Sequence, residues 1–252
     1  MNKQVNQVSI KADKAIPEVI EQQLTMLPLS CQIEPASLTC LVGPHRAQLR
    51  AYLQMLAGIT KLTEGELSLF GRKVSVIEPF DPIDGQKNRC QVGYLSGAAP
   101  LLSVQHGLMN VMLPVLYHEN SSFREASDKA RNLLAELNCD FEPTTYPALL
   151  NNFQRLQLSL ARALILDPLA LFLDVPFNDL GMKDRKNMGV LLAKYINNHT
   201  SCMIGGLQYP RFLEQHAKQI IFISEHNILK FDGWTSFKQS NDSEIHDLLS
   251  IL

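Results

Sequence analysis

Two short segments of this sequence hold the side chains that could do chemistry. Arg46 and Arg50 lie in the loop at residues 43–51, between an apolar run and a helical pattern, where a guanidinium could bind an anion. We predict the plainer role for both arginines, as solvated charges at the start of a helix. Asp174 ends a second apolar run, and we expect its carboxylate to bind backbone N–H groups of the following loop. His45 has no second His or Cys beside it, so no metal site is predicted.

Strands and helices must position these side chains, and the apolar pattern indicates both. Short continuous apolar runs bounded by turn residues are typical of strands buried on both faces of a parallel sheet. Such runs occur at residues 38–43, 169–174, 200–206 and 219–224. Helical patterns lie between them, at residues 49–58, 123–137 and 153–166. Strands that alternate with helices predict an α/β fold with a mainly parallel sheet.

The length of the chain predicts one domain with a subdomain. A chain of 252 residues can bury a full hydrophobic core, and we predict a single domain over residues 1–252. Residues 97–152 show helical patterns without a convincing strand, so we expect a helical insertion there. Residues 232–252 form a polar tail that closes with an apolar helix at 246–252.

Charge and cysteine content argue against several classes of protein. Lys+Arg total 23 and Asp+Glu total 25, and the net charge of −2 argues against a nucleic-acid binder with a broad basic surface. The most apolar stretch, residues 163–173, is broken by Asp167 and Pro168 and is too short to span a membrane. The first residues are polar, so we expect no signal peptide. The five cysteines include no C-x-x-C pair and suit reduced thiols in the cytosol.

A set of segments keeps a recognisable order and spacing along the chain. These segments are residues 28–44, Thr63-Glu-Gly-Glu-Leu-Ser-Leu-Phe-Gly71, Val92-Gly-Tyr-Leu95, Asn110-Val-Met-Leu-Pro114 and Leu173-Asp-Val-Pro-Phe177. Together they resemble the ATP-binding cassettes of ABC transporters, over about residues 27–252. The resemblance implies a P-loop NTPase-like (RecA-like) core with a mainly parallel sheet, an antiparallel β subdomain and a helical insertion subdomain.

The phosphate loop departs from the pattern of that family. A working loop reads G-x-x-x-x-G-K-[ST]: its glycines admit phosphate to the backbone, its lysine reaches the β and γ phosphates, and its hydroxyl holds Mg²⁺. Here Gln48 replaces the second glycine and is expected to intrude where phosphate approaches. Leu49 replaces the lysine and Arg50 the hydroxyl. The degenerate loop consists of Gly43, Pro44, His45, Arg46, Ala47, Gln48, Leu49, Arg50 and Ala51.

The other family positions have changed in the same way. The Walker B aspartate is kept as Asp174, but Val175 replaces the glutamate that polarises the attacking water. Gly97 stands at the Q-loop glutamine and Leu207 at the switch histidine. The signature, L-S-G-G-Q in the family, is here Leu150, Asn151, Asn152, Phe153 and Gln154. We expect Phe153 to block the close approach of a nucleotide bound by a facing subunit.

These losses predict a cassette that does not hydrolyse ATP and takes neither ATP nor Mg²⁺ as a cofactor. A mixed dimer with a competent cassette would contain no intact site, because the phosphate loop and the signature of this chain are both changed. The sequence therefore favours a structural or regulatory subunit of a membrane transport complex over half of an ordinary motor.

The resemblance also implies partners and a location. The expected partner is an ABC permease, together with a second cassette subunit or a second copy of this chain. The chain then lies in the cytoplasm at the inner membrane, which it reaches only through the permease. Short matches at residues 97–102 and 241–249 look similar to the lipid-transport branch that works with MCE proteins. The expected permease contacts are Leu101, Leu102, Leu108, Met109 and Met112.

Two other functions stay open from the sequence. The chain could be an ATPase with rearranged ligands such as Arg46 or Arg50, which Mg-ATP binding would reveal. It could also be a soluble interaction module that pairs with another cassette protein. Co-purification without any membrane protein would favour that third function.

Overall fold

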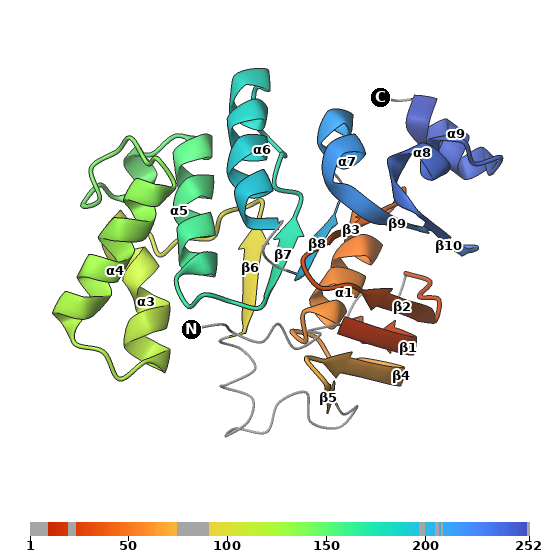
Figure 1. Ribbon diagram of the computed structural model, residues 1–252, viewed down its shortest axis with the longest axis horizontal. Helices are drawn as coiled ribbons and strands as arrows, with labels where there is room; N and C mark the ends of the chain where they lie inside the picture. The colour runs from red at the N-terminus through yellow and green to blue at the C-terminus, as the bar shows by residue number, and fades with distance from the viewer. Residues whose placement is uncertain are drawn as a thin grey trace.

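A six-stranded sheet forms the centre of the computed structural model, which describes residues 10–19, 24–74, 91–196, 200–204, 207 and 209–250. The strand order is β10-β9-β3-β8-β7-β6, and all neighbours except β10 and β9 pair in parallel (Figure 1). The strands are β3 (Leu38–Val42), β6 (Val92–Ser96), β7 (Ala170–Asp174), β8 (Thr200–Ile204), β9 (Ala217–Ile223) and β10 (Ile228–Phe231). The predicted α/β class with a mainly parallel sheet is confirmed.

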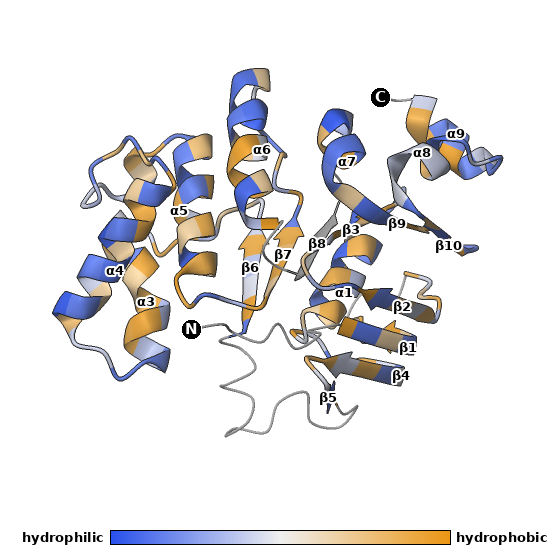
Figure 2. Cartoon of the chain, viewed as in Figure 1, coloured by the Kyte–Doolittle hydropathy of each residue, from blue (hydrophilic) through white to orange (hydrophobic). Residues whose placement is uncertain are grey.

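Strands β3 and β7 are continuous apolar runs because both of their faces are covered. Every residue of each strand is buried. Alternate residues point to opposite faces, so Leu171 and Leu173 join one core cluster while Phe172 joins the other. Figure 2 shows the apolar strands at the centre and helices with mixed polar and apolar faces around them. The helices that flank the sheet are α1 (Arg46–Leu56), α5 (Asn152–Leu164), α6 (Met182–Ile196) and α7 (Pro210–His216).

A second, antiparallel sheet packs beside α1. Its order is β2-β1-β4-β5, from β1 (Ile10–Pro17), β2 (Leu29–Ile33), β4 (Leu62–Leu69) and β5 (Arg72–Val74). Gly65 of β4 lies at a register shift in the antiparallel pairing with β1, has φ +80°, and a Cβ there would lie 2.1 Å from the carbonyl oxygen of Lys14. The close approach of the two backbones therefore requires glycine at this position. This sheet agrees with the antiparallel subdomain that the family resemblance implies.

The regular elements within residues 97–152, between β6 and β7, are helices joined by loops. They are α3 (Gly107–His118), α4 (Phe123–Glu136) and the 3-10 turn η1 (Pro147–Leu149), and α5 begins where they end. A capping box fixes the start of α4: the Ser122 hydroxyl accepts from the N–H of Glu125, whose carboxylate accepts from the N–H of Ser122. Helices α3 and α4 pack with α5 at the left of Figure 1, beside the strand β6.

The described part of the C-terminal segment folds back onto the sheet. Helix α8 (Gly233–Lys238) buries Trp234 and Phe237 against the core that includes β9, and α9 (Ser243–Ser250) buries Ile245. The predicted terminal helix thus begins at Ser243 instead of residue 246, and residues 251–252 lie outside the described residues. Helix α1 likewise begins at Arg46, three residues before the predicted start.

Candidate functional site

The loop after β3 keeps its first glycine for packing. A Cβ at Gly43 would lie 2.0 Å from the carbonyl oxygen of Ile223, so no larger residue fits against β9. Gln48 was expected to intrude on phosphate, but its side chain is only 1% exposed and is held by the protein. Its Nε2 donates to the carbonyl oxygens of Thr25 at 2.7 Å and Ser224 at 3.3 Å. Gln48 is therefore a tether between α1, the segment before β2 and the turn after β9.

Leu49, at the lysine position, is a core residue. Its side chain is 3% exposed and belongs to the cluster between α1 and the antiparallel sheet. The next residue of the helix, Arg50, points to the end of β7 and meets Asp174. Leu49 and Arg50 thus occupy the two positions that would hold phosphate and metal in a working loop.

Arg50 and Asp174 form the central contact of the site. Nε of Arg50 donates to Oδ2 of Asp174 at 2.6 Å, and Nη2 donates to Oδ1 at 3.4 Å. The Asp174 side chain is 2% exposed and the Arg50 side chain 40% exposed, so the guanidinium covers a buried carboxylate. The hydrogen bond to Asp174 is the main cause that raises the pKa of Arg50, and the nearby Tyr94 adds to it.

Two predictions about these residues are wrong. Arg50 is not a solvated charge, because its guanidinium makes a two-point contact with a buried carboxylate. Among the described residues, the carboxylate of Asp174 is bound by Arg50 and not by loop N–H groups. In the part of the chain that the structure describes, the backbone carbonyl of Asp174, and not its side chain, accepts such a bond, from the N–H of Gly97 at 2.7 Å. Arg46 is exposed at the start of α1, as predicted.

Val175 and Gly97 close the edge of the sheet beside this pair. Val175 is 4% exposed and has φ 48°, a conformation that β-branched residues rarely adopt. A Cβ at Gly97 would lie 2.7 Å from the carbonyl oxygen of Val175 and 2.9 Å from that of Asp174. The Q-loop position thus has no room for a side chain, and the position of the catalytic glutamate offers no acceptor for a proton.

The signature segment caps its own helix. Oδ1 of Asn151 accepts from the N–H of Gln154 at 2.9 Å, and Oε1 of Gln154 accepts from the N–H of Asn151 at 3.1 Å. Nε2 of Gln154 also donates to Asp140 at 3.1 Å. Leu150 is buried, and Phe153 packs against the same core cluster. The polar and aromatic groups of this segment are therefore engaged within the helical part of the chain.

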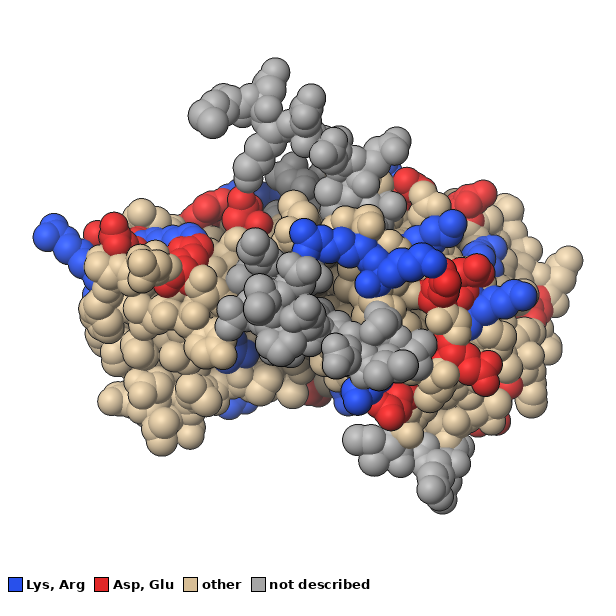
Figure 3. Space-filling view, turned by 90° about the horizontal axis from the view of Figure 1, so that it is seen from below, with Lys and Arg blue, Asp and Glu red and all other residues tan. Residues whose placement is uncertain are grey.

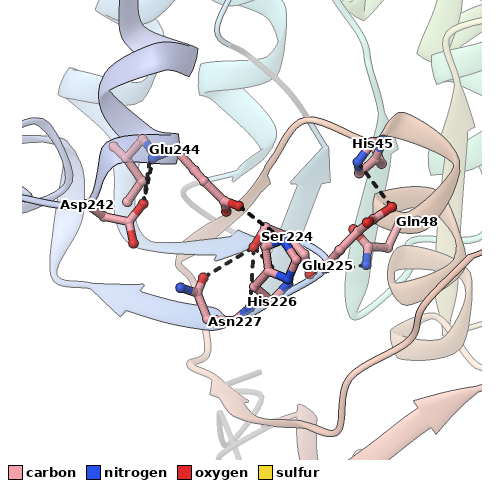
Figure 4. Close-up of polar contacts among 9 residues, drawn as sticks. His45, Gln48, Ser224, Glu225, His226, Asn227, Asp242 and Glu244 are labelled. Atoms are coloured by element: carbon pink, nitrogen blue, oxygen red, sulfur yellow. Dashed lines mark hydrogen bonds and ion pairs between the residues drawn. The ribbon is translucent and has the colours of Figure 1, made fainter.

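The switch position and the loop histidine also face protein. Leu207 lies in a turn and packs against the core, while residues 205–206 and 208 lie outside the described residues. Nε2 of His45 lies 3.5 Å from a carboxylate oxygen of Glu225 in the turn after β9 (Figure 4). Ser224 Oγ fixes that turn by accepting from the N–H groups of His226 and Asn227. Within the described residues, no group of three or more His, Cys, Asp or Glu could hold a metal ion.

The predicted permease contacts divide into buried and exposed residues. Leu108 is 5% exposed and Met112 is fully buried, because both belong to the core between α3, α4 and α5. The predicted contact is therefore wrong for these two. Leu101 and Met109 are half-buried, and Leu102 is 48% exposed.

The most exposed apolar residues of the helical part were not among the predicted contacts. Val104 and Leu149 are each 78% exposed, and Tyr117 is 75% exposed. The signal that could have found them is an absence of charge. No Asp, Glu, Lys or Arg occurs between Arg89 and Glu119, or from residue 143 to residue 154. Exposed apolar side chains in two charge-free segments indicate a contact surface.

The strand order, the loop between β3 and α1 and the helical insertion define a P-loop NTPase-like α/β protein. No protein-family model matches the chain. It is 28% identical over 172 residues to the sulfate/thiosulfate import ATP-binding protein CysA of Halalkalibacterium halodurans, which covers 67% of this chain. It is 31% identical over 176 residues to CysA of Bacillus cereus, which covers 69% of it. The chain spans 46% of the length of each of these two relatives.

A shorter relative and two solved structures extend this likeness. The chain is 25% identical over 212 residues to the lipoprotein-releasing system ATP-binding protein LolD of Neorickettsia sennetsu, covering 83% of this chain and 90% of LolD. A dimeric ATP-binding cassette with ADP and Pi bound superposes with a TM-score of 0.75 and 20% identity, over 89% of this chain and 100% of that chain. A cassette of the cbiONQ transporter complex from Clostridium perfringens gives 0.76 at 14% identity, over 97% and 95%. The chain belongs to the ATP-binding cassette family of ABC transporters.

No helix in the described part of the chain combines the length and apolar character needed to cross a membrane.

Proposed function

We propose that this chain is a catalytically degenerate cassette subunit with a structural or regulatory role in a membrane transport complex, and that it does not hydrolyse ATP. One observation carries the proposal. The guanidinium of Arg50 lies on the carboxylate of Asp174, with Nε 2.6 Å from Oδ2. In a working cassette these two positions hold a single Mg²⁺ ion, so the chain has its own cation where the metal would bind.

The residues at the site do not fit Mg-ATP. Mg²⁺ prefers oxygen ligands in octahedral geometry, but the oxygens of Asp174 are engaged by Arg50 and no hydroxyl stands at position 50. Leu49 is buried and supplies no charge to a phosphate. Val175 cannot accept the proton of an attacking water. No hydrolytic step can be derived from these side chains.

Electrostatics adds to this misfit. An incoming Mg²⁺ would have to displace a short charge-assisted hydrogen bond from a buried carboxylate. The guanidinium is attached to α1 and would remain close to the ion. Two unit charges 4 Å apart repel by about 4 kcal/mol at an effective dielectric constant of about 20, and Mg²⁺ carries two charges.

The proposed partner is an ABC permease, which contacts the uncharged part of the helical insertion. Leu102, Val104 and Leu149 are exposed there, in the two charge-free segments. The segments lie side by side, since the N–H of Gly107 donates to the carbonyl of Thr145 at 2.8 Å. In Figure 3 the lower left of the molecule is largely uncharged on the face shown, whereas the upper left edge and the right part carry charges of both signs. An apolar segment of a permease fits such a surface.

The signature segment limits what a dimer could do. Asn151 and Gln154 are hydrogen-bonded to each other, and Gln154 is also hydrogen-bonded to Asp140, so neither is free to clamp a nucleotide on a facing cassette. We propose that a second cassette, or a second copy of this chain, would gain no working site from the pairing. The subunit would then lie on the cytoplasmic side of the inner membrane through its permease, with a lipid-transport complex as the finer assignment.

The first test is ATP hydrolysis and Mg-ATP binding by the purified chain. We expect no magnesium-dependent turnover and no heat of binding in titration calorimetry. Turnover that Asp174→Ala abolishes would overturn the proposal and favour an ATPase with rearranged ligands. The same variant excludes a contaminating ATPase, because it would leave a contaminant's activity unchanged.

The second test is affinity purification of the tagged chain from gently solubilised native membranes. We expect a permease among the partners identified by mass spectrometry. Val104→Glu, at a side chain 78% exposed, should reduce its recovery at least several-fold. Val190→Glu is the matched control, because Val190 is 67% exposed on α6, outside the proposed surface. Recovery of soluble cassettes alone would instead favour an interaction module.

A further inference from the structure

We infer that residues 97–106, the docking loop that carries Leu102 and Val104, are fastened to the core in one conformation. The cassette would then hold its partner in a fixed orientation without moving it in response to nucleotide. The functional half of this inference rests on the proposed permease docking. The structural half concerns the chain alone and can be tested without a partner.

The first attachment is at Gly97, where the docking loop leaves β6. Its N–H donates to the carbonyl of Asp174 at 2.7 Å. A Cβ at this position would lie within 3.0 Å of Val175 O, Asp174 O and Val175 Cγ2. The peptide of the loop therefore rests directly on the backbone at the end of β7. A side chain at this position would hold the loop away from β7, whereas glycine allows direct contact.

The second attachment comes from α5. Nη2 of Arg162 donates to the carbonyl oxygen of Pro100 at 2.8 Å, and burial lowers the pKa of Arg162. A half-buried guanidinium needs an acceptor, because an unpaired one would lose its hydration without compensation. The carbonyl of the docking loop supplies that acceptor. Helix α5 thereby fixes the middle of the loop.

The third attachment is Asn110 on α3, which is fully buried. Its Oδ1 accepts from the N–H of Leu102 at 2.8 Å. Its Nδ2 donates to the carbonyls of Leu102 at 3.1 Å, Gln105 at 2.9 Å and His106 at 3.2 Å. Replacing this amide would leave the N–H of Leu102 and the carbonyl of Gln105 without their hydrogen-bond partner, whereas the carbonyls of Leu102 and His106 would keep the backbone N–H groups of Gln105 and Asn110. The end of the docking loop is thus bound from inside the helical part.

These attachments come from a strand end of the core and from two helices, so the docking loop is held at its start, in its middle and at its end. A loop held in this way cannot act as a hinge between the core and the helical part. Its exposed side chains are preorganised, which lowers the entropy cost of binding a partner. The contact at Gly97 is also made by backbone alone, next to the Arg50–Asp174 pair, so it needs no bound nucleotide.

Hydrogen exchange of the purified full chain, followed by mass spectrometry, tests the attachment. We expect the amides of Gly97, Ala99, Leu102 and Gln105, whose N–H groups donate hydrogen bonds, to be protected, and equally so with and without Mg-ATP. Gly97→Ala should speed exchange of this segment about 10-fold or more, which corresponds to about 1.4 kcal/mol. Gly181→Ala is the matched control, since a Cβ at Gly181 meets nothing within 4 Å. Peptides of α6 should exchange alike in the wild type and in both variants.

A second variant covers the case in which Gly97→Ala fails to fold. Arg162→Gln releases the docking loop from α5 and should also accelerate exchange in residues 97–106. Wild-type exchange as fast as that of an unstructured peptide, or a change on adding Mg-ATP, would overturn the inference. If the loop is protected but no permease co-purifies, the docking proposal fails while the attachment stands.

Discussion

Removing the guanidinium of Arg50 should destabilise the chain, because Asp174 would keep a buried charge without its counter-ion. Breaking one side of a fully buried ion pair costs about 3–5 kcal/mol. Here the Asp174 side chain is 2% exposed but Arg50 is 40% exposed, so water can enter the gap. A hydrogen bond to a charged group contributes about 1.5–3 kcal/mol. We therefore expect Arg50→Ala to lower the free energy of unfolding by about 2 kcal/mol.

Urea unfolding in EDTA measures this change without interference from divalent metals. Each kcal/mol shifts the melting temperature of a chain of this size by about 2–4 °C, so thermal unfolding of Arg50→Ala should show a melting temperature lower by about 4–8 °C. Arg50→Ala, Asp174→Asn and the double variant form a cycle, in which we expect a coupling energy of about 1 kcal/mol or more. Arg46→Ala, at an exposed arginine in the same turn of α1, should change stability by less than about 0.5 kcal/mol.

Two results would refute this reasoning. The first is an Arg50→Ala variant with the full stability of the wild type, and the second is a double-mutant cycle without coupling. In either case the guanidinium would not be the counter-ion of Asp174 in solution. The site could then accept a metal ion, and the observation that carries the proposed function would be lost.

Three further predictions concern other parts of the chain. Gln154→Ala removes one half of the capping box of α5 and the contact with Asp140. Chemical denaturation should show a free energy of unfolding lower by about 1 kcal/mol. An unchanged denaturation midpoint would mean that the cap is not formed. Gly65→Ala should cost more than about 1–3 kcal/mol, because strain at φ +80° adds to a backbone collision 2.1 Å from Lys14 O, and a soluble variant with wild-type stability would contradict this. Burial raises the pKa of the Cys31 thiol from 9.0 to about 12. The contribution of the buried thiol to folding stability is therefore complete below pH 9 and is lost between about pH 9 and 12. The stability difference between the wild type and Cys31→Ala should therefore shrink across that range, and rapid reaction of native Cys31 with a thiol reagent near pH 8 would argue against it.

The apolar pattern predicted the strands well because the central sheet is covered on both faces. Strands β3 and β7 lie within predicted runs and β9 overlaps one, since the residues between the two cores are mostly apolar. Thr39 of β3 is a buried polar exception, and its hydroxyl donates to Gln219. The predicted start of α4 is correct and that of α5 is one residue late, whereas α1 and α9 each begin three residues before the predicted start. The start of α1 lacks a side-chain cap at His45, so the sequence contains no capping signal there.

The permease contacts were mispredicted for a related reason. Helix α3 contains no Asp, Glu, Lys or Arg, so its apolar residues give little sign of which face is exposed. Only the packing of α3 against α4 and α5 shows that Leu108 and Met112 point inward. A charge-free helix can be recognised from sequence, but its orientation depends on residues far along the chain.

The Arg50–Asp174 pair could have been predicted from the resemblance. Its members are 124 residues apart in sequence, and no local pattern joins them. The family site, however, places both positions on one metal ion. A cation introduced at one of them should meet the carboxylate at the other. The prediction that Arg50 is a surface charge rested on its helix alone and did not include β7, the strand that faces it.

The covalent attachment of this counter-ion has a consequence for the behaviour of the protein in a cell. A protein that binds a ligand only when folded gains stability by mass action, about 2.7 kcal/mol when the free ligand is at 100 times its dissociation constant. Such a protein loses that gain when the ligand is depleted. Arg50 is present at unit occupancy under all conditions, so nothing need be drawn from solution to neutralise Asp174. If the chain binds no Mg-ATP, as proposed, its folding stability should not fall when ATP is depleted.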